Sequence, residues 1–275
     1  MMSFTYALQR DVIVATGKDT RSFLHSQLSN DIAGLAVGTT TYAFALEPTG
    51  KIAALLRVHC VADDHFVLDT DAGHAASAVA RLSKFKIRVK CEFVATTQTV
   101  TALRGLTAEL RSELLTKPGV VPAWRASDGA VDAFDNTDAI DAIDAMLRAG
   151  SDDDYHAERV RCAWPLFGVD IDVTSLPAET GLADVAVSFT KGCYPGQELV
   201  ERMDSRGSTA PHLLMRLPRV ANPLVSTLTN TSAVPGEKYV ANATELGVCT
   251  SVAGDFALVQ VRRACLGQAE QLNLS

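Results

Sequence analysis

The segment Lys191–Glu198, with the sequence KGCYPGQE, is dense in residue types that do chemistry. Cys193 stands two residues from Lys191, and an ammonium group near its sulfur would favour the thiolate and lower the thiol pKa. Gly192 and Gly196 permit backbone conformations and close approaches that are closed to other residues. The segment predicts either an activated thiol, nucleophilic or redox-sensitive, or a tight loop in which a small cysteine fills space.

The remaining sequence offers this thiol neither a base nor a metal. No histidine lies near Cys193 in the sequence, so a Cys–His hydrolase is not supported. No CxxC, HxH or HxxxH spacing occurs, which predicts no metal site and no bound iron–sulfur cluster. The cysteines are scattered over Cys60, Cys91, Cys162, Cys193, Cys249 and Cys265.

Two further groups of charged residues are candidates for a functional role. Glu198 and Arg202 stand four residues apart on a predicted short helix, where they can form an ion pair that is ordinary for a helix surface. Lys84–Phe93 alternates between cationic and apolar residues, which predicts a strand with one basic face. That face either steers a polyanion such as a poly-carboxylate tail or is simply solvated. Its cations are Lys84, Lys86, Arg88 and Lys90.

Composition bounds the class of protein. The chain has 275 residues, of which 47% are hydrophobic, enough for two or three compact units. Its net charge of −7 disfavours a general nucleic-acid binder, although a local basic pocket is still possible. Residues 1–5 do not resemble a signal peptide, and no apolar run is long enough to cross a bilayer. These features predict a soluble cytoplasmic protein with reduced cysteines and no membrane partner.

Strands and helices alternate through the first half, which predicts an α+β fold with ferredoxin-like units. A helix capped by Asp19 and a hairpin around Pro48-Thr49-Gly50 carry the clearest signals. The predicted strands are Asp11–Ala15, Tyr42–Leu46, Ile52–Val61, His65–Asp69 and Lys84–Phe93, with a helix at Asp71–Leu82.

The second half is more varied. Helices are expected at Thr107–Thr116 and Asn136–Ala149, followed by an acidic turn at Asp152–Asp154. From Pro211 onward the pattern is all β, which predicts a small C-terminal β-barrel.

The segment Lys191–Glu198, with its continuation to Gly207, closely resembles the signature of the YgfZ family of folate-binding proteins. Similar family-like stretches lie at 16–32, at the hairpin turn 48–51, and over Arg159–Gly168 and Leu176–Glu179. The resemblance is weakest around residues 95–150.

The resemblance implies the fold of the glycine cleavage aminomethyltransferase, or T-protein, in which three domains form a ring around tetrahydrofolate. The predicted division is 1–40 with 135–187, then 41–134, then 188–275 with the C-terminal barrel. It also implies Lys191 and Cys193 as the working pair, with Gly192 and Gly196 shaping the loop. The implied folate-binding residues are Tyr155, Arg159, Tyr194, Gln197, Glu198 and Arg202.

Two departures from the family pattern narrow the function. The aspartate that aminomethyltransferases carry after the hairpin turn falls here on Ala53 or Ala54, and a methyl group cannot activate a folate nitrogen. In the stretch before the signature, Arg161 and Ala163 replace an acid and a glycine, which weakens pterin recognition there. Tyr155 offers a flat face for a pterin ring, or is a core tyrosine.

The resemblance implies an accessory protein that binds tetrahydrofolate, or a derivative with or without a polyglutamate tail. Its implied role is the assembly or maintenance of iron–sulfur clusters in client or carrier proteins, outside conventional enzyme catalysis. The alternatives are a folate-dependent one-carbon (aminomethyl) transferase or demethylase, and a thiol-based redox or scaffold protein for which folate is irrelevant.

Overall fold

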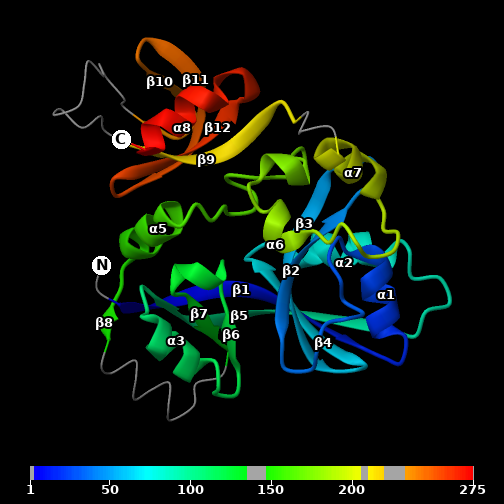
Figure 1. Cartoon of the computed structure of the whole chain (residues 1–275). Coiled ribbons are helices and arrows are strands. Elements are labelled where there is room, and N and C mark those ends of the chain that lie inside the picture. The colour runs from blue at the N-terminus through cyan, green and yellow to red at the C-terminus, as the bar shows by residue number, and fades with distance from the viewer. Residues whose placement is uncertain (1–2, 135–146, 206–209, 220–232, 275) are drawn as a thin grey trace. The chain divides into compact units, whose positions relative to one another are not determined.

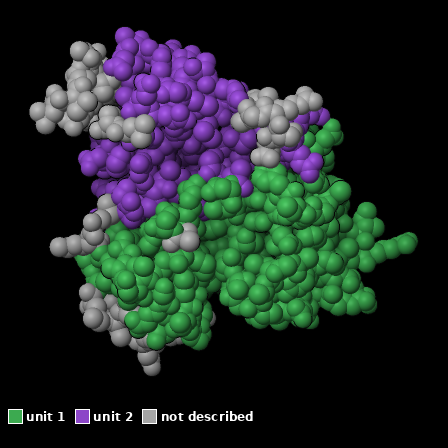
Figure 2. Space-filling model, in the orientation of Figure 1, with its two compact units in different colours: residues 1–151, 184–199 green, residues 152–183, 200–275 purple. Residues whose placement is uncertain are grey.

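The computed structural model describes residues 3–134, 147–205, 210–219 and 233–274. It divides into two compact units, residues 1–151 with 184–199 and residues 152–183 with 200–275 (Figure 2). The predicted three-part division is a different partition of the chain and stays a prediction.

The first unit is built on one large sheet, in the order β2-β3-β4-β1-β5-β7-β6, with β8 beside β1 (Figure 1). All these pairs are antiparallel except the parallel pair of β8 and β1. The strands are β1 (Phe4–Thr16), β2 (Thr40–Leu46), β3 (Ile52–Ala62), β4 (His65–Asp71), β5 (Glu92–Arg104), β6 (Val120–Pro122), β7 (Val131–Ala133) and β8 (Arg148–Ala149). Among the described residues, the α-helices that lie wholly within this unit are α1 (Thr20–Gln27), α2 (Ala75–Ser83) and α3 (Ala108–Leu114).

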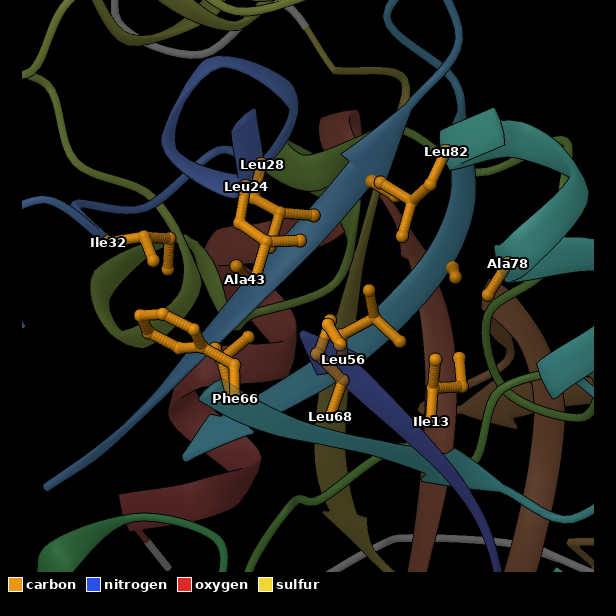
Figure 3. Packing of buried hydrophobic residues seen from close by; sticks show 14 of the residues in the cluster. Ile13, Leu24, Leu28, Ile32, Ala43, Leu56, Phe66, Leu68, Ala78 and Leu82 are labelled. Carbon is orange, nitrogen blue, oxygen red and sulfur yellow. The ribbon is translucent and has the colours of Figure 1, made fainter. Parts of the chain in front are cut away.

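Helices α1 and α2 supply apolar side chains to one face of this sheet. Figure 3 shows Leu24 and Leu28 from the α1 segment and Leu82 from α2 gathered over strand residues such as Leu56 and Phe66. All five side chains are buried, and each contributes about 1.5–3 kcal/mol relative to an exposed position. This packing holds the end of α1 in place.

An ion cluster lies on the other face of the same strands. Leu56 and Val58 face the apolar cluster, so Arg57 between them points to the opposite side. Its guanidinium makes two hydrogen bonds to Asp69, of 2.8 and 3.0 Å, and one of 2.8 Å to Asp132. Burial alone raises the pKa of Asp132, but Arg104 and Arg57 outweigh burial and lower it to about 2. The buried charges are therefore matched.

The second unit combines helices with a four-stranded antiparallel sheet, in the order β10-β11-β12-β9. Its elements are α5 (Asp152–Arg161), β9 (His212–Pro218), β10 (Lys238–Ala241), β11 (Thr244–Ala253), β12 (Phe256–Arg262) and α8 (Leu266–Leu274). Two helices, α6 (Ala183–Ala186) and α7 (Gln197–Ser205), run across the unit boundaries in the chain. Within the described ranges, no helix has the length and apolar character needed to cross a membrane.

Much of the predicted secondary structure is confirmed. The hairpin turn at Pro48-Thr49-Gly50 joins β2 to β3, and Gly50 has φ +80° as such a turn requires. The mixed α/β architecture is confirmed, and the C-terminal β structure is present as the sheet of the second unit.

The predicted basic strand at Lys84–Phe93 is wrong over most of its length. Residues 84–91 form an irregular turn between α2 and β5, and β5 begins at Glu92. Arg88 has φ +59°, a left-handed conformation outside the β region of regular strands. The four cations therefore do not share a strand face, and the basic strand that was expected to receive a poly-carboxylate tail is not formed.

Three smaller predictions are also corrected. The acidic turn at Asp152–Asp154 is the first turn of α5, where carboxylates stabilise the positive end of the helix dipole. The predicted helix Asn136–Ala149 falls mostly outside the described residues, and its last two positions form β8. The C-terminal region also contains α8, which the all-β pattern did not predict.

We expect Arg57→Met to destabilise the first unit by about 1–3 kcal/mol, because the buried Asp69 and Asp132 would lose the cation they share and keep only Arg10 and Arg104 as partners. Chemical denaturation measures the loss. The matched control is Lys86→Met, which removes a surface ion pair with Glu92 and should cost less than about 1 kcal/mol. Similar losses in the two variants would contradict the proposed importance of the cluster.

Candidate functional site

Lys191 anchors the start of the KGCYPGQE loop to the C-terminal end of α1. Its ammonium donates hydrogen bonds to the main-chain carbonyls of His25 and Leu28, the latter at 2.6 Å. It also lies 4.9 Å from the centre of the Tyr194 ring, within cation–π range. The last carbonyls of a helix lack partners within the helix and favour a nearby cation. Lys191 therefore caps α1.

This capping role changes the predicted relation between Lys191 and Cys193. Burial lowers the pKa of Lys191 to about 8, while Asp31 and a Cys193 thiolate act to raise it. Both hydrogen bonds of Lys191 nevertheless go to main-chain carbonyls, so its cation is already engaged.

Cys193 is the accessible thiol of the chain. All six cysteines fall within the described residues; Cys193 is exposed and the other five are buried. Tyr194, the next residue, is 7% exposed and fixes the loop from inside. The thiol is exposed to solvent, while Lys191 and Tyr194 on either side of it are held in place. This arrangement suits a group that reacts with an external partner.

The far end of the loop packs against the β2–β3 hairpin turn. Gly196 has φ +84°, and a Cβ there would lie 2.8 Å from the Glu47 carbonyl oxygen and 3.0 Å from Gly50 Cα. A Cβ on Gly50 would likewise meet the Leu199 side chain at 2.8 Å. Gly192 differs, since a Cβ there would meet nothing within 4 Å. Of the two predicted loop-shaping glycines, only Gly196 is sterically required.

The chain just before the loop is tied to the segment that follows α1. Ser29 Oγ donates to the Ala186 carbonyl at 2.6 Å and accepts from the Phe44 amide at 2.8 Å. Asn30 Nδ2 donates to the Val185 and Tyr42 carbonyls, at 3.0 and 2.8 Å. Segments remote in sequence thus meet around one short stretch, 28–31.

The positions matching the aminomethyltransferase aspartate carry no polar atom in their side chains. Ala54 is fully buried in the apolar cluster beneath α1 and α2, and Ala53 is also buried. A carboxylate at position 54 would be desolvated by that cluster. The packing of β3 here is apolar.

Two predicted folate-binding residues, Tyr155 and Arg159, lie on α5 in the second unit. Tyr155 is 3% exposed and Arg159 is 2% exposed. The Arg159 guanidinium donates to Asp170 at 2.7 Å and to Ser251 Oγ at 2.9 Å. These contacts give Arg159 a structural role within the unit, and folate contact by either residue stays a prediction.

Arg161 stands where the family pattern has an acid, and it is bound by a carboxylate one turn earlier. Its Nε and Nη2 donate to the two oxygens of Glu158 at 2.7 and 2.6 Å. Glu158 is fully buried, so this bidentate pair neutralises it. The substitution at 161 is thus accommodated by a local ion pair.

The remaining predicted site residues lie on α7, whose first two residues are the last two of the KGCYPGQE segment. Gln197 is half-buried, and Glu198 and Arg202 are exposed. The predicted helix at this place is confirmed. Their part in binding stays a prediction.

No spacing pattern in the sequence pointed to His25 and Asp31, which lie next to the site. His25 Nδ1 accepts from the Ala33 amide at 3.1 Å and lies 3.2 Å from Asp31 Oδ1. Burial and then Lys191 lower the pKa of His25, while Asp31 raises it. A family resemblance over 16–32 was the only hint.

Over the described parts of the chain, no three His, Cys, Asp or Glu side chains are grouped to hold a metal ion.

Comparisons with known proteins agree with this fold. Residues 11–116 match the model of the GCVT N-terminal domain family. The solved structure of a glycine cleavage system aminomethyltransferase T from Bartonella henselae superposes with a TM-score of 0.75 at 18% identity, covering 96% of this chain and 79% of that one. The chain therefore has the aminomethyltransferase-like fold.

Curated proteins with similar sequences carry more specific names. An iron-sulfur cluster assembly factor IBA57 homolog, mitochondrial, from Mycosarcoma maydis is 27% identical over 72% of this chain and 53% of the relative. A tRNA-modifying protein YgfZ from Vibrio vulnificus is 24% identical over 71% of this chain and 64% of the relative. The alignments thus span about half to two thirds of these relatives' lengths. The predicted resemblance to YgfZ-type folate-binding proteins is confirmed.

We expect Gly196→Ala to destabilise the first unit by about 1–3 kcal/mol, because the new Cβ collides with the hairpin backbone and the residue has a positive φ. Gly192→Ala is the matched control and should be nearly neutral. Thermal unfolding measures both. Equal stabilities would show that the hairpin does not constrain the loop.

The depressed pKa of Lys191 predicts a pH dependence of stability. Between pH 8 and the ordinary lysine pKa, the unfolded state holds a proton that the folded state has released, so stability should rise with pH over that window. Lys191→Met should lose this component. Denaturation of both proteins at several pH values measures the difference, and identical pH profiles would contradict the assignment.

Proposed function

We propose that this protein binds tetrahydrofolate or a derivative and assists the assembly or maintenance of iron–sulfur clusters in client enzymes, through the KGCYPGQE loop. Its similarity to an iron–sulfur cluster assembly factor and to YgfZ supports this proposal, as does the aminomethyltransferase-like fold. The family model over residues 11–116 supports the folate part.

One observation carries the proposal: an exposed thiol stands on a loop that is fixed at both ends. Lys191 holds one end to α1, and Gly196 packs the other against the hairpin turn. Holding the backbone in advance lowers the entropy lost when a partner meets Cys193. A cysteine that only filled space would be buried, as the other five are.

The described residues fit a folate in part. Glu198, the last residue of the KGCYPGQE segment, is an exposed carboxylate, and a carboxylate accepts hydrogen bonds from the N–H groups of a reduced pterin. Arg202 is an exposed cation that suits a glutamate carboxylate of the same ligand. We assign Glu198, Arg202 and Gln197 as the polar contacts and Tyr194 as a support. Folate would supply the one-carbon or redox chemistry of the bound state.

Aminomethyl transfer is disfavoured. Ala53 and Ala54 are buried and carry no carboxylate, so β3 offers no such group to position a folate nitrogen. We therefore propose an accessory role in place of transferase activity. Formation of methylene-tetrahydrofolate from an aminomethyl donor by the purified protein would overturn this point.

The partners follow from the same features. We propose iron–sulfur client or carrier proteins as the macromolecular partners, without direct contact to nucleic acid or membrane. The net charge of −7 disfavours binding to a phosphate backbone, although the YgfZ relative is named for tRNA modification. We propose a cytoplasmic location, whereas the IBA57 homolog is named as mitochondrial.

Titration with tetrahydrofolate under anaerobic conditions tests the binding. We expect saturable binding that weakens in Glu198→Gln and Arg202→Met, while Lys117→Met, a cation on the turn after α3, binds as wild type. No saturable signal at physiological folate concentrations would refute the folate assignment.

Complementation of a gene deletion tests the role of the thiol. We expect Cys193→Ala to leave iron–sulfur enzyme activities at the level of the deletion, because the exposed thiol is lost without disturbing the core. Gly192→Ala should restore them like wild type. Full rescue by Cys193→Ala would remove the thiol from the mechanism.

A further inference from the structure

Within the part of the chain that the structure describes, strand β5 has one open edge over most of its length. It pairs with β1 from Glu92 to Arg104, whereas on its other side it pairs with β7 only at Thr101–Leu103. Among the described residues, the stretch Glu92–Val100 therefore has strand pairing on one side only. An open edge presents unpaired N–H and C=O groups that can pair with another chain.

This edge lacks the features that usually block such pairing. Residues 93–100 read FVATTQTV, with no charge, no proline and no glycine, and the pairing with β1 shows no bulge. Six consecutive residues, 94–99, are exposed, and Val94 is 61% exposed. The stretch has high β propensity and is accessible on both sides of the sheet.

A basic turn lies at the beginning of the open edge. Residues 84–91, the turn that projects at the right of Figure 1, carry the exposed side chains of Arg88 and Lys90. Lys86 is paired with Glu92 at 3.0 Å, so the local charge is set by the other cations of the turn. Ile87, between Lys86 and Arg88, is 77% exposed. An acidic chain would find both charge and apolar contact here, although the protein as a whole carries −7.

The backbone of the turn is held in this form at some cost. Arg88 adopts φ +59°, a region that non-glycine residues rarely occupy. The Lys90 amide donates to Asp19 Oδ2 at 2.9 Å, which ties the end of the turn to the N-terminal end of α1. Arg88 and its neighbour Ile87 are thus exposed on a turn whose end is held by a hydrogen bond.

We propose that the open edge of β5 and the turn 84–91 form a docking site for an extended acidic segment of a partner protein. The segment adds a strand along Phe93–Val100, with its carboxylates next to Arg88 and Lys90. This inference does not depend on folate binding or on Cys193.

A labelled peptide tests the proposal: an acidic head followed by alternating valine and threonine, with a lysine-headed peptide for comparison. We expect the acidic peptide to bind the full-length protein and to slow amide hydrogen exchange over residues 92–100. Arg88→Glu should weaken binding about tenfold, because a carboxylate partner would meet a like charge. Lys117→Glu, with the same charge change elsewhere, should bind as wild type. Equal binding of the two peptides would overturn the charge assignment.

Proline substitution tests strand addition itself. Main-chain N–H groups alternate between the two sides of a strand, so one of Ala95→Pro and Thr96→Pro removes a donor from the open edge while the ladder to β1 survives. Circular dichroism identifies the folded variant, which we expect not to bind the acidic peptide. Unchanged binding would overturn the proposal. A wild-type dimer in sedimentation that this proline dissociates would also overturn it, since the edge would then belong to a second copy.

Discussion

The contact between the Lys191 ammonium and the last carbonyls of α1 is the constraint on which the loop depends. It joins residues that are 163 positions apart in the chain. A helix end without partners is costly, and a half-buried ammonium without acceptors is costlier still, so each group stabilises the other. The same contact fixes where the KGCYPGQE loop starts and hence where Cys193 lies.

This contact also alters how the thiol should be understood. The spacing of two residues predicted that Lys191 stabilises the Cys193 thiolate. In the structure, the hydrogen bonds of Lys191 go instead to main-chain carbonyls at the end of α1. What distinguishes Cys193 is its exposure on a backbone whose two ends are held. The function proposed for Cys193 accordingly depends on the accessibility of its thiol to a partner more than on a dedicated ion pair.

The large sheet of the first unit separates two kinds of interior. One face carries the apolar cluster under α1 and α2, to which Ala54 belongs, and the other carries the Arg57 ion cluster. Because successive strand residues alternate between faces, a single shift of register in β3 would exchange these environments. The hairpin turn at Gly50 fixes that register and receives the KGCYPGQE loop at the same point.

The sequence by itself determined the elements with strong local signals: the β2–β3 hairpin, α1, α7 and the C-terminal strands. It also identified the KGCYPGQE segment as the candidate site, since glycine, proline and cysteine at fixed spacing are a local feature. It failed at 84–91, because alternating cations and apolar residues fit a turn as well as a strand, and only the left-handed backbone at Arg88 distinguishes them. Tertiary structure alone decided that Lys191 meets α1, that Gly196 is required and Gly192 is not, and that β5 keeps an open edge. These outcomes depend on packing between segments remote in sequence, which local spacing does not encode.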